Sequence, residues 1–598
     1  MFARIAFAII ALAAPAALSQ PQIAGAPTAS PEPIMVAILW HQHQPHYLQS
    51  PDTGEYAQPW VRLHAVKDYC DMVTILEHHP NVRVTVNLTP VLINQMRDLG
   101  ARWENGHPTD AYVRHTLLDP AEMTGEEKAF VLRNFFSLNW QRMLERHPRY
   151  VELRDKRPGT GDAEIAQAIA AYTDQDFRDL QMLFNLAWMD PDFFEGATLP
   201  DGTEIDVGPW VEQGRDFTEE DKRTLIAMHF QIMAQVIPIH RAAQDRGQIE
   251  VSTTPFYHPI LPLIVDTDSA REGIPSIALP RQRFRQPGDA RQHVTRAASQ
   301  YAELFGEAPR GLWPGEGSVS HDCLPLFADA GITWFATDVQ VLARSLGVND
   351  PPAAQRFSMW QCRADDATVA GIFRDTGLSD RIGFTYSSWD GAEAAQDFVR
   401  ILHDIREAVA REAQRPLSQY VIPVILDGEN CWESYENDGK EFLETLYTLL
   451  GGDPLLRTVT VSECLMQSGE LPVIDRLAAG SWISANFETW IGEDEENRAW
   501  DLLAEARAAF ASAEFTDGED HEIALDLLLR AEGSDWFWWY GSDQSVDGEQ
   551  AFDEQFRGTL RHAYAVMGLD PPAELDQPIM QGAGAASGGG VMAPGMAP

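Results

Sequence analysis

Carboxylic acids and aromatic rings follow one apolar run in the segment LDGENCWESY, residues 426–435. Asp427 and Glu429 come first, and Trp432 and Tyr435 come next. Cleavage of a glycosidic bond needs two carboxyl groups, because one protonates the leaving oxygen while the other attacks the anomeric carbon or activates water. Aromatic faces can stack on the C–H faces of sugars. The segment is therefore compatible with carbohydrate chemistry, with Asp427 and Glu429 as candidate carboxyl groups and Trp432 as a candidate aromatic face.

Three further carboxylates stand at or near the ends of other apolar runs. Glu250 lies in QIEVST, Glu316 ends GLWPGE, and Asp338 ends ITWFATD. Each of them alone is explained equally well as a helix N-cap or an ion-pair partner. Together with Asp427 and Glu429 they are better explained as parts of one site, because residues at strand ends can meet at the mouth of a barrel.

Two histidines in HQHQP, His41 and His43, are spaced so that both imidazoles point to the same face of a strand. Such a pair could bind a metal ion, with His258, His321 and Asp338 as further candidate ligands, or it could hydrogen-bond a polar substrate. None of these residues has a spacing that is diagnostic of a metal site. The metal interpretation predicts a polysaccharide deacetylase-like or amidohydrolase-like barrel that depends on the ion.

A run of aromatic residues occurs in SDWFWWYG near the C-terminus, where Trp536 follows Asp535. One interpretation is a plug of the hydrophobic core. The polar flanks favour a second interpretation, a loop that offers stacking faces to a sugar.

Seven apolar runs precede or contain these polar residues, and they are IMVAILW, VRVTVNL, QIEVST, GLWPGE, ITWFATD, VAGIFRD and YVIPVILD. Most are separated by amphipathic segments such as RLHAVKDYCDMVTILEHH, which predict helices. The alternation is typical of parallel strands with crossover helices. It predicts a barrel of β/α units with Arg374, Asp338 and Asp427 at strand ends, and an open doubly wound sheet is the structural alternative.

The organisation of the rest of the chain follows from pattern and composition. We expect residues 35–440 to form the barrel with a helical insertion around 101–247, and residues 441–570 to form a mainly helical domain. An apolar stretch behind Arg4 predicts a secretory signal peptide at 1–19 and export to the periplasm or the medium. Low-complexity composition predicts a flexible lead-in at 20–34 and a disordered tail at 571–598.

Composition excludes some classes of partner. The 598 residues carry a formal net charge of −44, which argues against nucleic acids and anionic membranes as partners because both are polyanions. The five cysteines have no metal-binding spacing, and one disulfide bridge is compatible with export. The 17 tryptophans fit a protein that handles carbohydrate. The sequence does not indicate the oligomeric state.

The motifs WHQHQPHY, GQIEVSTTPFYHPILPLI, GLWPGEGSVS, VILDGENCWESY and GSDWFWWYG occur in this order, and together they closely resemble the five motif regions of glycoside hydrolase family 57. The resemblance is strongest to the amylopullulanase and α-amylase-like branch. It implies an incomplete (β/α)7 barrel followed by a helical region that helps to build the cleft. It also implies a retaining enzyme that acts on α-glucans without a cofactor or a catalytic metal.

The same resemblance implies roles for individual residues. Glu316 matches the nucleophile and Asp427 the general acid/base. The other matched or neighbouring positions are expected to bind substrate, and these are His41, His43, Glu250, Trp313, Asp338, Arg374, Glu429, Trp432, Asp535 and Trp536. A nucleophile must be ionised, whereas an acid needs a raised pKa from burial and a negative neighbour such as Glu429. A 4-α-glucanotransferase, a branching enzyme and a non-catalytic glucan-binding protein stay open as alternatives.

Overall fold

The computed structural model of the chain describes residues 32–50, 53–515, 517–541 and 549–580. The predicted signal peptide lies outside the described residues, as do most of the predicted lead-in and residues 581–598. None of the described helices combines the length and the apolar character needed to cross a bilayer.

Seven parallel strands form a barrel in chain order, and they are β1 (Ile34–Gln42), β2 (Val84–Leu88), β5 (Ile249–Ser252), β6 (Gly311–Leu312), β7 (Trp334–Asp338), β9 (Ala367–Arg374) and β10 (Val421–Asp427). One sheet contains β10, β1, β2 and β5 as neighbours, and a second contains β9, β7 and β6. A bridge between Thr253 and Leu312 joins the two sheets. All seven runs are strands, so the predicted α/β barrel is confirmed and the open sheet is excluded.

The barrel is incomplete between β9 and β10. The backbone N–H of Asp375 donates to the carbonyl of Pro423 at 3.4 Å, and Arg374 Nε donates to the carbonyl of Ile425 at 2.9 Å. The N–H and C=O of one strand residue point to the same side, so the ring nitrogen of Pro423 also faces β9, where it has no hydrogen to donate. The edge of β9 that does not face β7 is also paired with β8 over Ala367–Gly371. Both features limit pairing between β9 and β10, and the incomplete (β/α)7 fold is confirmed.

Residues alternate between the barrel interior and the surrounding helices along each strand. In β1, Met35, Ala37 and Leu39 pack with the interior cluster, whereas Val36 and Ile38 pack with the outer core. All nine residues of β1 are buried, as expected for a parallel strand covered on both faces. The alternation sets which residue at the end of each strand faces the interior.

Five further strands extend this framework, and they are β3 (Ala197–Thr198), β4 (Glu204–Ile205), β8 (Trp360–Ala364), β11 (Leu456–Thr458) and β12 (Val473–Ile474). β8 pairs antiparallel with β9, and β12 pairs with β8. β11 pairs with the first residues of β1. The chain after residue 440 therefore stays with the barrel sheets for more than thirty residues, whereas the sequence pattern predicts mainly helices from 441.

Helices cover the outside of the barrel, and the longer ones are α1 (Trp60–Ala65), α2 (Asp68–Thr74), α3 (Pro90–Glu104), α13 (Pro287–Phe305), α14 (Leu324–Asp329), α15 (Val339–Leu346), α18 (Gly391–Glu412), α19 (Lys440–Gly452) and α20 (Val461–Gln467). α18 shows why they form. Asp390 caps its N-terminus by accepting the N–H of Glu393, and Phe398 and Leu402 bury one face.

Short helices and turns connect these elements, and they are η1 (Ile75–His78), α11 (Leu261–Val265), η4 (Thr267–Ser269), α12 (Ala270–Gly273), η5 (Gly315–Gly317), η6 (His321–Cys323), α16 (Ala353–Arg356), α17 (Thr376–Asp380), η7 (Arg381–Thr385), η8 (Tyr386–Ser388), η9 (Leu417–Gln419), η10 (Trp432–Ser434) and η11 (Glu436–Gly439). Most of them lie in the segments after strands, where the site residues are found.

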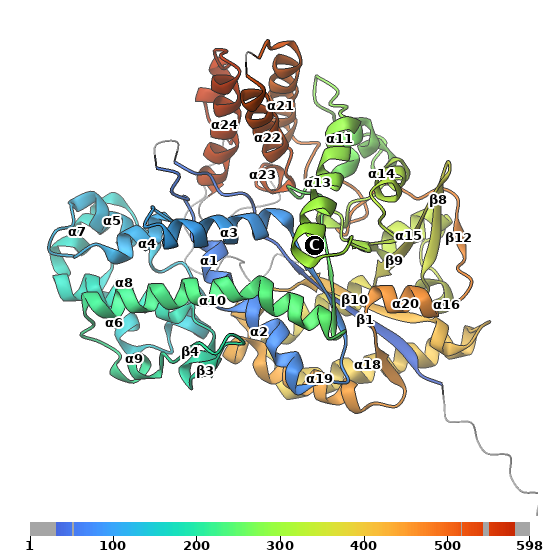
Figure 1. Cartoon of the computed structure of the whole chain (residues 1–598), viewed down its shortest axis with the longest axis horizontal. Helices are drawn as coiled ribbons and strands as arrows, with labels where there is room; N and C mark the ends of the chain where they lie inside the picture. The colour runs from blue at the N-terminus through green and yellow to red at the C-terminus, as the bar shows by residue number, and fades with distance from the viewer. Residues whose placement is uncertain (1–31, 51–52, 516, 542–548, 581–598) are drawn as a thin grey trace, which may run out of the picture.

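The helical insertion between β2 and β5 lies on one side of the barrel (Figure 1). It contains α4 (Ala111–Leu117), α5 (Gly125–Asn134), η2 (Trp140–Leu144), α6 (Pro148–Lys156), α7 (Asp162–Ala171), α8 (Asp174–Ala187), η3 (Pro191–Phe194), α9 (Gly208–Gln213) and α10 (Glu219–Asp245). The long α10 runs back to β5. A reciprocal pair of hydrogen bonds between Thr218 and Asp221 begins it.

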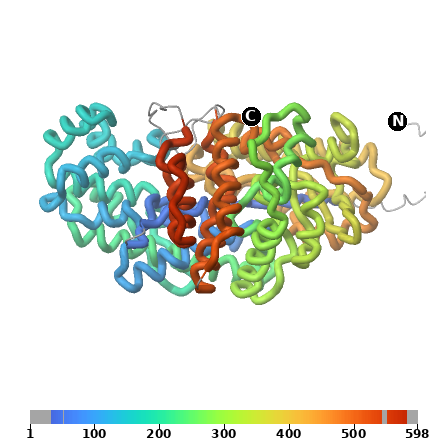
Figure 2. The backbone as a smooth tube through the Cα atoms, turned by 90° about the horizontal axis from the view of Figure 1, so that it is seen from above, coloured from blue at the N-terminus to red at the C-terminus, as the bar shows by residue number. Residues whose placement is uncertain are grey.

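A group of C-terminal helices stands over the barrel, as Figures 1 and 2 show. It consists of α21 (Asp494–Ser512), α22 (Gly518–Ala531), α23 (Ser534–Trp538) and α24 (Glu549–Val566). The turn η12 (Ala573–Asp576) follows, with Leu575 and Ile579 fully buried. Leu575 and Ile579 thus anchor the segment 571–580, whereas the sequence predicts a disordered tail from 571.

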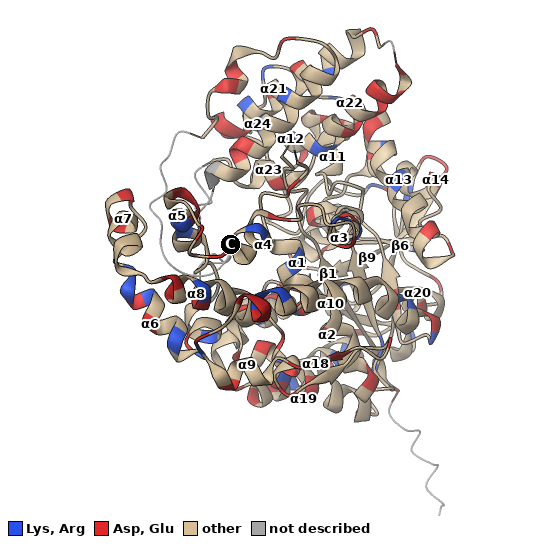
Figure 3. Cartoon of the chain, turned by 60° about the vertical axis from the view of Figure 1, so that its left-hand side comes forward, with Lys and Arg blue, Asp and Glu red and all other residues tan. Residues whose placement is uncertain are grey.

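The five cysteines are all described, and each is a buried free thiol. The single disulfide that the sequence allowed is not formed. Figure 3 shows acidic residues spread over the outer helices of the barrel, the insertion and the C-terminal group. The negative charge is therefore a property of the whole surface and marks no single binding face.

Candidate active site

Strand periodicity brings four predicted residues to the mouth of the barrel, the end at which the parallel strands finish. His41 continues the interior series of β1, and Asp427 continues that of β10, which contains Ile425. Asp338 and Arg374 are the last residues of β7 and β9. The strand registers set His41 beside Asp427, and Asp338 beside Arg374.

Glu316 belongs to the same site, although a turn and not a strand carries it. It lies in η5 with φ 55° and ψ 28°, a left-handed conformation that costs a residue other than glycine free energy. Its Oε2 accepts a hydrogen bond from Trp482 Nε1 at 2.8 Å, and its carbonyl accepts the N–H of Trp482 at 3.1 Å. The neighbouring Gly315 leaves room for this turn, because a Cβ there would lie 2.6 Å from the carbonyl oxygen of Pro259.

The two carboxyl groups are electrostatically coupled. Burial, and then the charge of Asp427, raises the pKa of Glu316 to about 8. Burial raises the pKa of Asp427 to about 6, against a hydrogen bond from Asn430 and the positive charges of His43 and Arg374. Burial therefore disfavours the charged form of both carboxyl groups, and the charge of Asp427 adds to this effect at Glu316. The assignment of Glu316 as nucleophile and Asp427 as acid stays a prediction.

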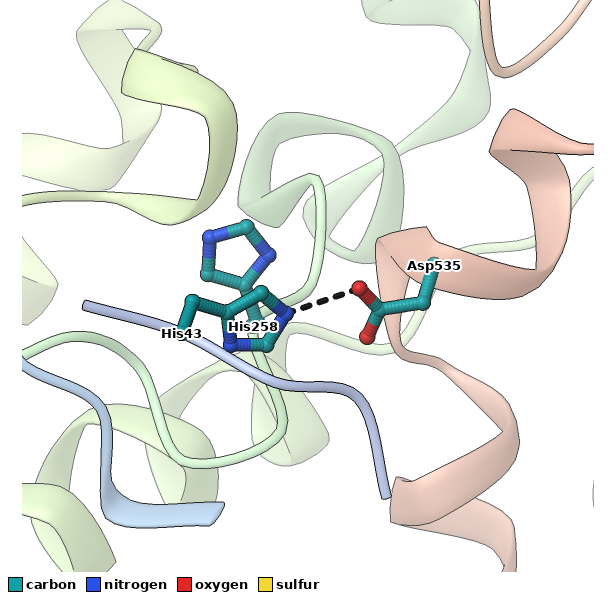
Figure 4. Close-up of side chains that lie close together, drawn as sticks. All are labelled: His43, His258 and Asp535. Carbon is teal, nitrogen blue, oxygen red and sulfur yellow. Dashed lines mark hydrogen bonds and ion pairs between the residues drawn. The ribbon is translucent and has the colours of Figure 1, made fainter. Parts of the chain in front are cut away.

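A histidine pair and an aspartate lie together at the mouth, as Figure 4 shows. His43 Nε2 is 2.7 Å from Asp535 Oδ1. The ring of His258 stacks on that of His43 with centroids 3.8 Å apart, and His258 Nδ1 lies 2.9 Å from Ser534 Oγ. Asp535 and Ser534 belong to α23, so the C-terminal helices supply part of the site.

His41 is a neutral imidazole with a defined tautomer. Burial, and then the charge of His43, lowers its pKa to about 3. Asn87 uses its amide N–H to donate to the carbonyl of Thr253, so its Oδ1 faces His41 Nδ1 at 2.7 Å. Nδ1 of His41 must then carry the hydrogen, and Nε2 has the lone pair.

Arg374 links two acidic groups and lies against the ring of Trp482. Its guanidinium contacts Asp338 Oδ2 at 3.3 Å and also pairs with Asp380. It lies over the ring of Trp482, 5.1 Å from the centroid. Burial raises the pKa of Asp338 to about 6, and the charge of Arg374 opposes this shift. Asp338 and Arg374 therefore hold each other and support Trp482, which itself holds Glu316.

Glu429 contacts the site through its first carboxylate oxygen, which accepts the backbone N–H of His43 at 2.9 Å. Its second oxygen is buried and has no hydrogen-bond partner among the described residues. Burial, and then the charge of Asp427, raises the pKa of Glu429 well above its usual range. Glu429 thus fixes the backbone that carries His43.

Metal ligation was weighed for His41 with His43, but the geometry selects another set. Ligand atoms of His43, His258 and Asp535 lie within 4.8 Å of one another. His41 Nδ1 is occupied by Asn87 instead. His43 contacts Asp535, and His258 contacts Ser534. These contacts form a hydrogen-bonded cluster that can hold a polar ligand.

Glu250 is not at the mouth, which corrects the prediction. It faces the barrel interior at the level of Leu39, one layer below His41 in the strand registers. Its carboxylate accepts hydrogen bonds from Trp334 Nε1 at 3.0 Å and from the backbone N–H of Ser462 at 2.8 Å. Trp334 is the first residue of β7, so the Glu250 carboxylate is held inside the barrel and below the mouth.

Three predicted aromatic contacts are core residues. Trp432 is fully buried, donates to the carbonyl of Gly428 at 2.9 Å and packs on Trp40. Trp536 is 2% exposed and packs in the core of the C-terminal helices. Trp313 is buried beneath the site, where its ring lies 5.9 Å from that of His41. The stacking role predicted for Trp432 and Trp536 is therefore not supported.

Two residues of the site escaped the sequence analysis as substrate contacts. Trp482 lies in GSWISANFETW, a loop after the last barrel strand that has no pattern of its own. His258 was considered only as a metal ligand, although it lies within the motif GQIEVSTTPFYHPILPLI. Only the folded chain shows that both lie beside Glu316 and His43.

Comparison with known proteins now decides the family. The model of glycosyl hydrolase family 57 matches residues 37–475. The chain belongs to this family. The match begins in β1 and ends at β12, so it spans the whole barrel, both carboxyl groups of the site and the loops that carry them. No curated protein matches the sequence significantly.

Solved structures of this family have the same fold. An α-amylase from Thermotoga maritima is 14% identical with a TM-score of 0.53, over 90% of this chain and 93% of that one. A branching enzyme from Thermococcus kodakaraensis is 15% identical with a TM-score of 0.54, over 89% and 90%. A branching enzyme from Pyrococcus horikoshii is 14% identical with a TM-score of 0.53, over 94% and 100%. These likenesses concern the fold, including the C-terminal helices.

Proposed function

We propose that this family 57 member cleaves or transfers α-glucan chains by double displacement, with Glu316 as nucleophile and Asp427 as general acid/base. The observation that carries the proposal is the coupling of these two buried carboxyl groups at the barrel mouth. A retaining glycosidase uses one carboxyl group as the acid and a second, ionised one as the nucleophile. The α-amylase and branching enzymes of the same fold support α-glucan as the substrate.

In the first step, a carboxylate oxygen of Glu316 attacks the anomeric carbon. The bond from that carbon to the glycosidic oxygen breaks, and the oxygen takes the proton of Asp427. Trp482 Nε1 donates a hydrogen bond to the carboxylate of Glu316 and so stabilises its ionised form. In the second step, Asp427 removes a proton from water or from a sugar hydroxyl, which then displaces Glu316 and regenerates both groups.

The proton must leave Glu316 before the first step. In the empty site Glu316 has the higher pKa because of its burial and the charge of Asp427. A bound sugar places a glycosidic oxygen next to Asp427 and positive charge develops at the anomeric carbon, so both changes favour the proton on Asp427 and the charge on Glu316. We infer that substrate binding moves a proton from Glu316 to Asp427.

The neighbouring groups are suited to hold sugar hydroxyls. His41 offers an acceptor nitrogen, while His43, Asp535 and Arg374 offer polar and charged atoms at the same mouth. Trp482 is partly exposed and gives the site an aromatic face beside Glu316. We also propose export from the N-terminal residues, which would place the enzyme where polysaccharide is available. Detection of the mature chain in the medium or the periplasm tests this proposal.

Azide rescue tests the two roles separately. With a 4-nitrophenyl α-maltooligoside, Glu316→Ala should be inactive, and azide should restore turnover and give the inverted glycosyl azide. Asp427→Ala should still form the glycosyl-enzyme with this good leaving group, and azide should give the retained product. The opposite pairing of products would exchange the roles, and loss of rescue in both variants with intact folding would refute double displacement.

Product analysis on soluble starch, pullulan and maltoheptaose then assigns the reaction. Shorter maltooligosaccharides indicate hydrolysis, longer chains indicate 4-α-glucan transfer, and new α-1,6 branches indicate a branching enzyme. Activity that survives EDTA dismisses the metal-dependent deacetylase or amidohydrolase alternative. Binding of glucan without any turnover by the wild type would leave only the non-catalytic alternative.

A further inference from the structure

Three aspartates outside the active site converge from distant parts of the chain. Asp71 lies on α2, Asp190 caps η3 within the insertion, and Asp438 lies in η11 between β10 and α19. One carboxylate oxygen from each lies within 4.8 Å of the other two. Asp190 and Asp438 are buried and Asp71 is partly buried. This set, the aspartate triad, joins the barrel to its insertion.

The triad contains a buried acceptor that is not paired. Asp438 is 7% exposed, and Lys67 Nζ lies 2.6 Å from its Oδ1. Its Oδ2 is buried and has no hydrogen-bond partner among the described residues. A buried carboxylate oxygen without a partner costs free energy of the order of ~1–3 kcal/mol, so the site is built for an additional donor or cation.

Carboxyl groups outnumber cations around the triad. Lys67 and Arg146 act on the triad, and Lys440 acts on Asp190. The neighbouring carboxyl groups that act on the triad or on Lys67 are Asp68, Asp192 and Glu433. Burial, and then the charges of the other aspartates, raises the pKa of Asp71 and of Asp190. A cation bound between the carboxylates would therefore stabilise their ionised forms.

We propose that the aspartate triad binds one calcium ion. Calcium is coordinated by oxygen at about 2.3–2.6 Å, so two oxygens on one ion are at most about 5 Å apart, and the triad meets this limit. Magnesium usually keeps several waters and is bound through one or two carboxylates, whereas this set offers three. Zinc favours nitrogen and sulfur ligands, which this oxygen-only set does not supply.

The protein already orients each aspartate. Asp190 Oδ1 accepts the N–H of Asp192 at 2.7 Å, and Asp71 Oδ1 accepts the N–H of Met72 at 2.6 Å. The backbone N–H of Asp190 donates to the carbonyl of Val66 at 3.1 Å, which ties the insertion to the chain before α2. An ion bound here would hold α2, the η3 segment of the insertion and the segment before α19 together (Figure 1).

Calorimetric titration of the full chain with calcium chloride after EDTA treatment tests this proposal. The NaCl concentration is held constant, because any salt screens a net charge of −44. We expect saturable binding of one calcium ion per chain, weaker binding of magnesium, and a higher Tm in calcium than in magnesium. Asp190→Asn should lower the calcium affinity at least about tenfold, because affinity follows ligand charge.

Two further variants make the outcome decisive. Asp71→Asn changes the partly exposed member of the triad, so it serves if Asp190→Asn does not fold. Asp162→Asn is the matched control, because the Asp162 side chain is fully exposed on α7, and it should bind calcium like the wild type. Wild type without saturable binding, or undiminished affinity in both triad variants, would overturn the calcium site. A triad that only shares protons would give that negative result.

Discussion

Replacing Trp482 by phenylalanine removes one hydrogen bond and keeps an aromatic ring in the site. The indole N–H donates to Glu316 Oε2 at 2.8 Å, and the ring also packs against Trp313 and Arg374. A hydrogen bond to a charged group contributes about 1.5–3 kcal/mol, which corresponds to about 1–2 pKa units. Because the bond lowers the pKa of Glu316, its loss should make ionisation harder.

We expect two linked effects in Trp482→Phe. The acidic limb of the profile of kcat/KM against pH should move up by about 1–2 pH units. At neutral pH, kcat/KM should fall about 10- to 150-fold, the factor that corresponds to the lost bond. The Tm should change little by comparison, because the ring that packs on Trp313 is retained.

The assay is hydrolysis or transfer on maltoheptaose over a range of pH, with circular dichroism to confirm folding. Trp389→Phe is the matched control, since Trp389 is 45% exposed and packs on Tyr386, away from Glu316. An unchanged acidic limb with kcat/KM within about twofold of the wild type would refute the role of Trp482. So would an equal loss in Trp389→Phe.

Three other outcomes follow from the contacts. Glu316→Gln should raise the Tm more at pH 9 than at pH 5. Burial raises the pKa of Glu316 from 4.5 to about 8, so the folded wild type loses stability as the pH rises through that window. Equal Tm gains at both pH values in calorimetry would contradict this. Trp432→Ala should lower the free energy of unfolding by about 3–5 kcal/mol, because its ring is buried in the core. A rise in KM with no loss of stability in urea unfolding would contradict this core role. Glu250→Gln should cost about 1–3 kcal/mol of stability but leave kcat/KM within a few-fold, and an inactive variant of native Tm would show that Glu250 serves the chemistry.

The strands could be predicted because their signal is local. β-branched runs of four to eight residues separated by amphipathic helices mark parallel strands, and all seven runs are strands. The period of two along a strand also sets Asp427 and Asp338 at interior positions of the mouth. Glu250 obeys the same rule, yet it lies a layer too low, because the level of a residue depends on strand register and not on the pattern alone.

Aromatic residues were harder to place. Trp432 and Trp536 stand in motifs beside carboxylates, but both are buried in cores, whereas Trp482 in an unpatterned loop contacts Glu316. A tryptophan can fill a core or face a ligand, and its sequence context is similar in both cases. Burial of the surrounding chain decides between them.

The sequence by itself determined the barrel, its family and the acids that could do the chemistry, because periodicity and motif are properties of neighbouring residues. Only the tertiary structure sets how readily these acids ionise, since the pKa of Glu316 depends on burial and on the charge of a residue more than one hundred positions away. The tertiary structure also decided that α23 completes the site through Asp535, and that three distant aspartates meet. Electrostatic interaction and desolvation act through space, so the order of residues along the chain does not contain them directly.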